Sequence, residues 1–300
     1  MERKLIKQGG GGFTIYLPKK WVDKKKLKAG DMIKISETET ALIVGSDIKE
    51  KKETTITINE DNEHDIKHLL THAYRMGVDK IRLKYDDKKY CKEVRKLVSH
   101  LLLGFEITKT TDEVMTIENI TEPEAERYET ILDKAFMVIE ETITNTKESL
   151  SSGKYDWEEM NELRNLTDKY LIFCRRLLTL EKYEKNIALE WEMLTFMMHI
   201  QHTTYYLYKY SHDNKIKALK KYEEEMTNLE ITFKEYSEAY KKKSVELIHK
   251  INSSREKHLF GMLLTSMEKS KGKETVIYSY IKEILRLIQI GTSPILSMSL

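Results

Sequence analysis

Residues 124–300 hold the pattern that most constrains this chain. Apolar residues recur there at spacings of three and four, glycines are few, and no proline interrupts the run before Pro294. This spacing collects apolar side chains on one face of an α-helix and does not fit the alternation of a strand. We therefore expect residues 124–300 to be helical throughout.

Interruptions divide this region into six expected helices. They lie near residues 151–153, 181–183, 211–214, 240 and 270–272. The halves 124–210 and 211–300 are nearly equal in length, and residues 168–178 (DKYLIFCRRLL) are alike in type and placement to residues 256–266 (EKHLFGMLLTS). Such self-similarity indicates an internal repeat of three-helix units.

A shorter segment, residues 54–120, has the alternation of a small α/β module. Its expected strands are residues 54–58, 80–84, 106–109 and 114–117, and its expected helices are residues 64–75 and 89–103. Gly77 and Gly104 follow the two helices, as glycines that end helices do. The charged stretch 49–53 and the stretch 121–123, which ends in proline, are the expected linkers on either side.

The first 48 residues contain only short elements. We expect strands at residues 4–8, 13–17, 32–35 and 40–44, one helical turn at 18–22, and a hairpin turn at 36–39. These pieces bury too little apolar surface to fold alone, so a partner must complete their core. The simplest partner is a second copy of the chain.

Positive charge is concentrated in the first 35 residues, although the whole chain carries a net charge of only +2. The acidic residues of this segment are only Glu2, Asp23 and Asp31. Its basic residues are Arg3, Lys4, Lys7, Lys19, Lys20, Lys24, Lys25, Lys26, Lys28 and Lys34. A local positive excess suits binding to the phosphate backbone of a nucleic acid, because neutralised phosphates release counterions. For residues 24–28, a solvated turn in a lysine-rich protein is the alternative.

The segment RKLIKQGGGGFTIYLPKKWVDKKKLKAGDMIKI, followed by TALIVGS, resembles the swapped-hairpin DNA-binding domain of the AbrB, MazE and SpoVT families. The shared marks are a basic first strand, glycine before an alternating strand that ends in Leu17, Pro18 and Lys19, the aromatic Trp21, and Leu27 followed by Gly30 and Asp31. The resemblance implies an interlocked homodimer that lays basic side chains along DNA. By that likeness the candidate DNA contacts are Arg3, Lys4, Lys7, Gln8, Lys19 and Lys20. The glycine run 9–12 is longer than the family's single glycine, and it either approaches phosphates through backbone N–H groups or forms a plain flexible turn.

Composition argues against several classes of protein. Cys91 and Cys174 are unlike in spacing and context, so neither a disulfide framework nor a zinc site is expected, and we expect both to be core thiols in a reducing cytosol. No N-terminal signal is evident, and the uncharged run 287–300 is too short to span a bilayer. We therefore expect a soluble cytoplasmic protein without membrane insertion.

Histidines offer one candidate metal site. His64, His68 and His72 recur every four residues along the expected helix 64–75, whereas His100 lies apart. No cysteine or carboxylate completes a four-ligand set at a known spacing. A partly exposed helix face, or a contact with neighbouring domains, is the alternative to a metal site.

The duplicated helical region resembles the PhoU family, whose proteins are tandem three-helix bundles involved in controlling phosphate uptake. Residues 165–178 (NLTDKYLIFCRRLL) and 198–208 (MHIQHTTYYLY) carry the likeness. The family holds metal clusters with E/D-x-x-x-D motifs, because carboxylates one helical turn apart can share a hard cation. Here Asp168 and Glu256 each lack the carboxylate four residues earlier, so a cluster of the family type is not expected.

His199 and His202, together with Asp168, remain candidate ligands for a single transition-metal ion. The alternative is a pair of hydrogen-bonded histidines beside a bundle. We expect the aromatic group Tyr205, Tyr206, Tyr208 and Tyr210 to pack between helices with its hydroxyls at the rim. No Ser/His/Asp set, phosphate-binding loop or dinucleotide fingerprint stands in an interpretable context, so we expect neither an enzyme nor a cofactor.

The expected fold class is multidomain α+β: a swapped-hairpin β domain over residues 1–48, a small α/β module over 54–120, and an all-α body of two three-helix repeats over 124–300. We expect a dimeric DNA-binding transcriptional regulator of phosphate uptake, whose helical body senses a signal or docks a partner protein. This joint arrangement is similar to archaeal PhoU-like proteins regarded as phosphate-uptake regulators. One alternative is a PhoU-type adaptor of a phosphate transporter or its signalling partner, with the N-terminal domain serving to dimerise. The other is antitoxin-like neutralisation through the N-terminal domain.

Overall fold

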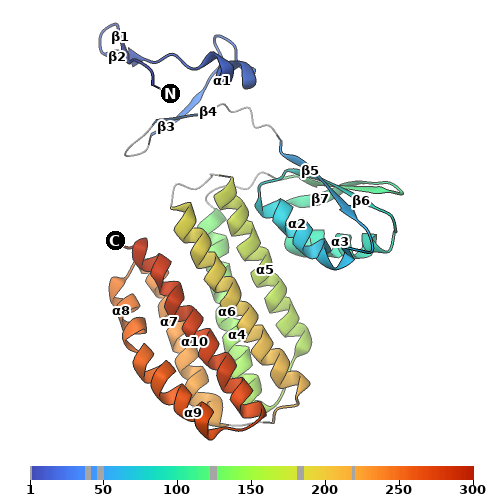
Figure 1. Ribbon diagram of the computed structural model, residues 1–300, viewed down its shortest axis with the longest axis vertical. Helices are drawn as coiled ribbons and strands as arrows, with labels where there is room; N and C mark the ends of the chain where they lie inside the picture. Colours follow the sequence, from blue (N-terminus) through green and yellow to red (C-terminus); the bar gives the residue numbers. More distant parts are fainter. Residues whose placement is uncertain (1, 38–41, 46–50, 122–126, 181–185, 218–219) are drawn as a thin grey trace. The chain divides into compact units, whose positions relative to one another are not determined.

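The computed structural model describes residues 2–300 except 38–41, 46–50, 122–126, 181–185 and 218–219 (Figure 1). In this described part the chain is mixed α+β, with small sheets before residue 120 and helices after it. The chain divides into two units, Met1–Lys51 and Lys52–Leu300. The expected hairpin turn 36–39, linkers 49–53 and 121–123, and helix break 181–183 fall wholly or partly outside the described residues.

The first unit consists of two hairpins and a short helix. Its elements are β1 (Ile6–Gln8) paired antiparallel with β2 (Gly12–Thr14), α1 (Lys19–Lys24), and β3 (Lys34–Glu37) paired antiparallel with β4 (Leu42–Gly45). The expected strand 13–17 ends at Thr14, because pairing with β1 stops at Ile6, the register partner of Thr14. Of the expected strand 40–44, residues 40–41 are outside the described part.

The described residues of the first unit form no buried core within a single chain. No residue of this unit whose burial is described is buried, and large apolar side chains are exposed to solvent. The most exposed are Met32 at 86% and Tyr16 at 71%, with Leu5, Phe13, Ile35 and Leu42 close behind. A folded domain normally covers side chains of this size, so the unit is incomplete by itself.

The second unit begins with a four-stranded sheet. Its elements are β5 (Glu53–Ile58), α2 (Ile66–Arg75), β6 (Lys80–Tyr85), α3 (Tyr90–Leu101), β7 (Phe105–Thr110) and β8 (Val114–Asn119). The strand order is β5-β6-β8-β7, with β5 and β6 parallel and the other pairs antiparallel. Gly77 and Gly104, with φ of 77° and 81°, follow the two helices as expected.

One face of this sheet is covered and the other is polar. Ile81, Leu83 and Tyr85 alternate along β6 as buried residues, and the residues between them are exposed. Figure 1 shows α2 and α3 on the covered side, and both helices contact α5 in turn. A single apolar cluster therefore runs from the sheet into the helical region, which makes Lys52–Leu300 one unit.

The helical region is built from helices that lie side by side, most of them long (Figure 1). They are α4 (Arg127–Ser152), α5 (Trp157–Thr179), α6 (Ile187–Asp213), α7 (Glu223–Lys242), α8 (Val245–Ser253), α9 (Leu263–Lys269) and α10 (Lys273–Ser297). A π-helical turn, Glu256–Met262, stands between α8 and α9. α10 lies along α6, and α4 contacts α5, α6 and α7. No helix among the described residues is both long and apolar enough to cross a bilayer.

Most expected helix breaks are confirmed. Gly153, with φ of 72°, follows α4, and α6 ends at Asp213. The break expected near residue 240 falls at Lys243, whose left-handed φ of 50° ends α7. The single helix expected between the breaks near 240 and 270–272 is divided between α8, the π-helical turn and α9.

Gly291 permits a close approach between α10 and its neighbours. A Cβ at this position would lie 3.1 Å from the hydroxyl of Tyr236 on α7 and 3.2 Å from the Cβ of Phe196 on α6. Both distances are tighter than ordinary contacts. The absence of a side chain at residue 291 therefore sets how closely three helices meet.

Candidate functional site

Five of the candidate DNA contacts are basic residues exposed on the first unit. Arg3 and Lys4 precede β1, Lys7 lies within it, and Lys19 and Lys20 begin α1. Within the described part of the chain, no carboxylate pairs with any of these five side chains. Charge that the fold leaves unpaired is available to an external polyanion.

Gln8 is placed differently from these basic residues. Its side-chain oxygen accepts a hydrogen bond from Thr14 Oγ1 at 2.5 Å. Successive side chains of a strand point to opposite faces, so Gln8 shares a face with Thr14, whereas Lys7 shares the other face with its register partner Phe13. The hairpin therefore presents Lys7 and Gln8 on opposite faces.

The turn between β1 and β2 requires glycine at two of its positions. Gly9 and Gly11 have φ of 61° and 131°, which side chains other than glycine rarely adopt. The Gly11 N–H donates to the Gly9 carbonyl at 3.0 Å, so this donor already has a partner inside the turn. The conformation accounts for part of the four-glycine run.

Asp168, a candidate metal ligand, lies where three helices meet. Its carboxylate, on a residue only 3% exposed, accepts from Lys67 Nζ of α2 at 2.7 Å and from His202 Nε2 of α6 at 2.9 Å. Burial would raise the pKa of Asp168, but the hydrogen bond from His202 and the charge of Lys67 together lower it below its usual value. Both carboxylate oxygens thus serve internal contacts.

The other histidines do not join Asp168 in a metal site. His199 is exposed on α6, where it helps Arg286 lower the pKa of Glu283 on α10. His64 lies in a 3-10 turn before α2, so the row of three histidines is not on one helix as expected. Across the described residues, no group of three His, Cys, Asp or Glu side chains is placed to hold a metal ion.

The tyrosine group on α6 packs as expected for its buried members. Tyr205 donates to Asn161 Oδ1 at 2.9 Å and Tyr208 donates to the Asp156 carbonyl at 2.8 Å, so both hydroxyls have partners on or just before α5. Tyr206 is 45% exposed. Of the two expected core thiols, Cys174 is buried, which raises the pKa of its thiol, and Cys91 is half-buried.

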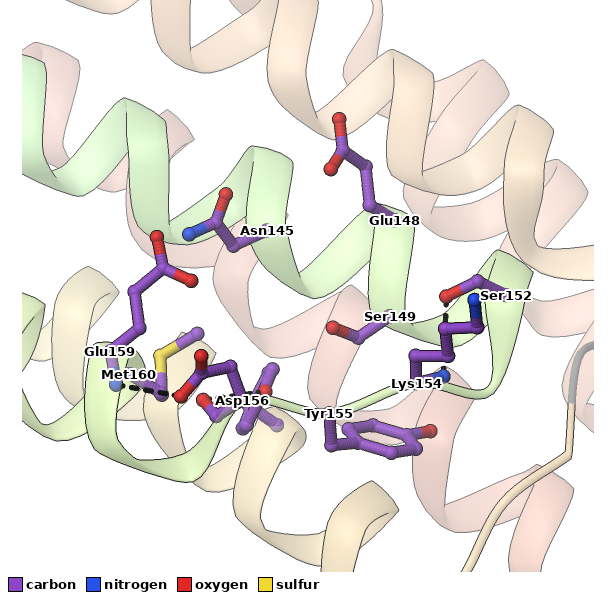
Figure 2. Close-up of a pocket in the computed structure, with 10 residues that line it drawn as sticks. Asn145, Glu148, Ser149, Ser152, Lys154, Tyr155, Asp156, Glu159 and Met160 are labelled. Carbon is purple, nitrogen blue, oxygen red and sulfur yellow. Dashed lines mark hydrogen bonds between the residues drawn. The ribbon is translucent and has the colours of Figure 1, made fainter.

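A polar cavity of about 320 Å³ opens beside the turn between α4 and α5 (Figure 2). Figure 2 shows Asp156 and Glu159 together at one end and Ser152 with Lys154 at the other. Asp156 Oδ1 accepts from the Glu159 N–H at 3.0 Å, and Ser152 Oγ accepts from the Lys154 N–H at 3.2 Å. These bonds cap α5 and fix the turn, and no motif in the sequence pointed to this cavity.

Arg176 on α5 is a buried residue that sequence reasoning missed. Its Nη1 donates to the carbonyls of Tyr74 at 2.7 Å and Val78 at 2.8 Å, and its Nη2 donates to Asp79 Oδ1 at 3.0 Å. Its guanidinium also lies 4.8 Å from the ring of Phe105. Arg176 therefore joins α5 to the connection between α2 and β6. The signal available in the sequence was the pair of arginines within the otherwise apolar run 171–178.

Comparison of the chain with models of known protein families, with curated proteins and with solved structures found no match. Function can therefore be inferred only from the charges, burial and geometry of the chain's own residues. Two regions are candidates for a functional role. One is the first unit, which is basic and has no buried core of its own, and the other is the set of polar contacts that α5 makes within the second unit.

Proposed function

We propose that this chain is a cytoplasmic, dimeric DNA-binding regulator of transcription that acts on phosphate uptake, and that its first unit is a swapped-hairpin domain like those of AbrB, MazE and SpoVT. The observation that carries the proposal is the coincidence of unpaired positive charge with a missing core. Lys4, Lys7 and Lys19 have no carboxylate partner among the described residues, and Phe13 and Met32 stand exposed in the same unit.

A second copy of the first unit would meet both needs at once. Removing apolar surface from water is favourable by about 25 cal/mol per Å², and the exposed apolar side chains of the first unit are large. A twofold dimer also brings two sets of basic residues to one DNA duplex, which matches two half-sites. Dimerisation and DNA binding thus draw on the same small segment.

The helical body is proposed to be a pair of three-helix units of the PhoU type. Among the described elements, α4, α5 and α6 supply one set of three, and α7, the α8–α9 segment and α10 supply the other. Such a body would sense a signal or dock a partner protein, and its state would be passed to the DNA-binding unit of the same chain. No catalytic role is proposed.

One observation favours a second candidate function. Lys7 and Gln8 point to opposite faces of the β1–β2 hairpin, so one face of a single hairpin does not offer all the candidate contacts to DNA. In that alternative the chain is an adaptor of a phosphate transporter or of its signalling partner. The first unit then serves to dimerise.

A gel-shift experiment with DNA from upstream of the chain's own gene separates the two functions. We expect the wild-type protein to retard this DNA and the Lys4→Glu/Lys7→Glu variant to bind at least tenfold more weakly. Lys84→Glu/Lys109→Glu is the matched control, because both lysines are exposed in the second unit and the change in charge is identical. Two outcomes contradict DNA binding through the first unit. One is equal retardation of the DNA by all three proteins, and the other is no retardation by any of them although the protein is still a dimer.

A further inference from the structure

A cavity of about 270 Å³ opens where the α/β module meets the long helices. Its lining residues come from three helices of the second unit, and α5 contacts both α2 and α3. α2 contributes Lys67 and α5 contributes Asn165, whereas α3 contributes Glu93, Lys96, Leu97, His100 and Leu101. Pockets for small ligands usually measure about 300–1,000 Å³, so this cavity suits a small molecule and not a polymer.

Two leucines of α3 supply the apolar lining of the cavity. Leu97 and Leu101 are four residues apart, which places them one above the other on the same face of the helix. Leu101 is buried, whereas Leu97 is half-buried, so the neighbouring helices cover it only in part. An apolar group placed on Leu97 would remove this remaining surface from water, which is favourable.

Two lysines bring positive charge to the same cavity. Lys67 Nζ donates to Asp168 Oδ2 at 2.7 Å, and an ammonium group has further N–H donors that a ligand can use. The side chain of Lys67 is 34% exposed and that of Asp168 is 4% exposed, so Lys67 connects the open cavity to a buried carboxylate. Lys96 is exposed and has no ion pair with any residue that the structure describes.

The other polar lining residues limit the charge that a ligand can carry. Glu93 lines the same cavity, and its carboxylate repels a second negative charge on a ligand. Nδ1 of His100 lies 2.8 Å from the backbone oxygen of Lys96, so the N–H of this ring nitrogen is used within α3. A ligand with one negative charge therefore fits the cavity better than a multivalent anion does.

We infer that this cavity binds a small organic molecule that has one carboxylate and a short apolar body. The carboxylate accepts hydrogen bonds from Lys67 and Lys96, because bonds between ionised groups are the strong ones. The apolar body lies on Leu97 and Leu101. Inorganic phosphate meets only part of this lining, because it has no apolar group and carries more charge than Glu93 allows.

Lys67 makes such a ligand visible to the long helices. A bound carboxylate competes with Asp168 for the same ammonium group, and Asp168 also accepts from His202 of α6 at 2.9 Å. Occupation of the cavity therefore changes the contact that joins α2, α5 and α6. The site goes beyond DNA binding and does not depend on it, because all these residues belong to the second unit.

The test uses the full-length chain and four probes: hexanoate, hexylamine, adipate and inorganic phosphate at equal ionic strength. The unfolding temperature and the heat of binding are recorded. We expect hexanoate to bind once per chain and to raise the unfolding temperature, because a ligand of the folded state stabilises it. The amine, the dicarboxylate and phosphate should bind at least tenfold more weakly. Equal binding of hexylamine and hexanoate would contradict recognition of a carboxylate. The Lys4→Glu/Lys7→Glu variant should keep the hexanoate response, which separates this site from DNA binding.

Variants identify the residues that hold the ligand. Lys96→Gln changes an exposed position and should weaken hexanoate binding at least tenfold. Lys92→Gln is the matched control, because Lys92 is exposed on the same helix and does not line the cavity. Leu97→Glu puts a negative charge in the apolar part of the cavity and should abolish binding. Asp168→Asn should bind hexanoate more tightly than the wild type, because Lys67 then has no competing carboxylate. Absence of a saturable hexanoate response in the wild type, or its full retention in Lys96→Gln and Leu97→Glu, overturns the inference.

Discussion

Asp168 Oδ1 and His202 Nε2 lie 2.9 Å apart between α5 and α6, and Lys67 of α2 closes on the second oxygen of the same carboxylate. One buried carboxylate thus connects three helices. Removing this carboxylate is costly because Lys67 loses its counter-charge and His202 loses its hydrogen-bond partner. His202 and Lys67 are partly exposed, so solvent recovers some of that cost.

We expect Asp168→Ala to lower the free energy of unfolding by about 2 kcal/mol and to leave DNA affinity unchanged. Urea denaturation and anisotropy measure the two quantities. Asp133→Ala, which removes an exposed ion pair with Lys241, is the control and should cost about 0.5 kcal/mol. Equal losses in the two variants would show that burial of Asp168 contributes nothing.

The same carboxylate predicts the direction of an acid effect. The folded-state pKa of Asp168 lies below its usual value, so the stability it contributes is complete above the pKa of the unfolded chain and is lost as the pH falls through the folded pKa. Between about pH 5 and about pH 2, the wild type should therefore lose more stability than Asp168→Asn, which has no carboxylate to protonate. Parallel curves of unfolding free energy against pH would contradict this.

Replacing Arg176 should destabilise the second unit strongly. Arg176→Met removes the donor to the carbonyls of Tyr74 and Val78 and to Asp79 Oδ1, and we expect a loss of about 4 kcal/mol in the free energy of unfolding. The control is Arg82→Met, whose pair with Glu53 at 3.5 Å is exposed on the sheet and should be worth less than about 1 kcal/mol. Denaturant unfolding of both variants decides the comparison.

Residues 1–48 expressed alone should form an interlocked dimer, because the described part of this segment has no buried side chain in a single chain. Analytical ultracentrifugation measures the mass. Met32→Glu places a charge at the most exposed large apolar side chain of this segment and should weaken the dimer at least tenfold, whereas Glu37→Gln should not. A folded monomer at micromolar concentration would refute the dimer.

DNA affinity should fall steeply with salt. Each phosphate contact made by Lys or Arg contributes about 0.9 to the slope of log affinity against log salt concentration. Changing Lys7 to Gln should reduce that slope by about one contact, and Lys84→Gln in the second unit should leave it unchanged. Fluorescence anisotropy at several salt concentrations provides the slopes. An affinity that does not respond to salt would mean that the basic residues do not touch the phosphate backbone.

The purified protein should lack a stoichiometric multinuclear iron or zinc cluster. A hard cation needs six or more oxygen contacts, and the oxygens of Asp168 already bind Lys67 and His202. In the second half, Asn252 bonds to Thr292 at 3.3 Å in place of a carboxylate pair. Elemental analysis that finds two or more metal ions per chain, lost in Asp168→Ala, would restore a metal site of the PhoU type.

Local pattern was enough to place most elements of the second unit. The alternation of strands and helices between residues 53 and 119 follows from the periodicity of apolar residues. Gly77 and Gly104, which have positive φ, mark the ends of the two helices, and this signal is local in the sequence. The strand expected at 13–17 is shorter in the structure. A strand extends only as far as its pairing partner, and pairing with β1 stops at Thr14.

The polar junctions could not be predicted in the same way. Lys67 and Asp168 are 101 residues apart in the chain, and only the packing of α2 on α5 brings them together. Arg175 and Arg176 are adjacent and chemically identical, yet a rotation of about 100° around the helix gives them different surroundings. Arg175 donates to α6 and Arg176 to the connection between α2 and β6, and neither composition nor spacing separates the two.

Gly291 has a consequence for the natural variation of this protein. Its missing side chain lets Tyr236 and Phe196 reach the backbone of α10, at distances that leave no room for even one methyl group unless a neighbour moves. Among homologues, a larger residue at 291 should therefore occur only together with a smaller one at 196 or 236. The three positions would then vary together. In an alignment of homologues, the sizes of the residues at these three sites would indicate how closely α6, α7 and α10 pack.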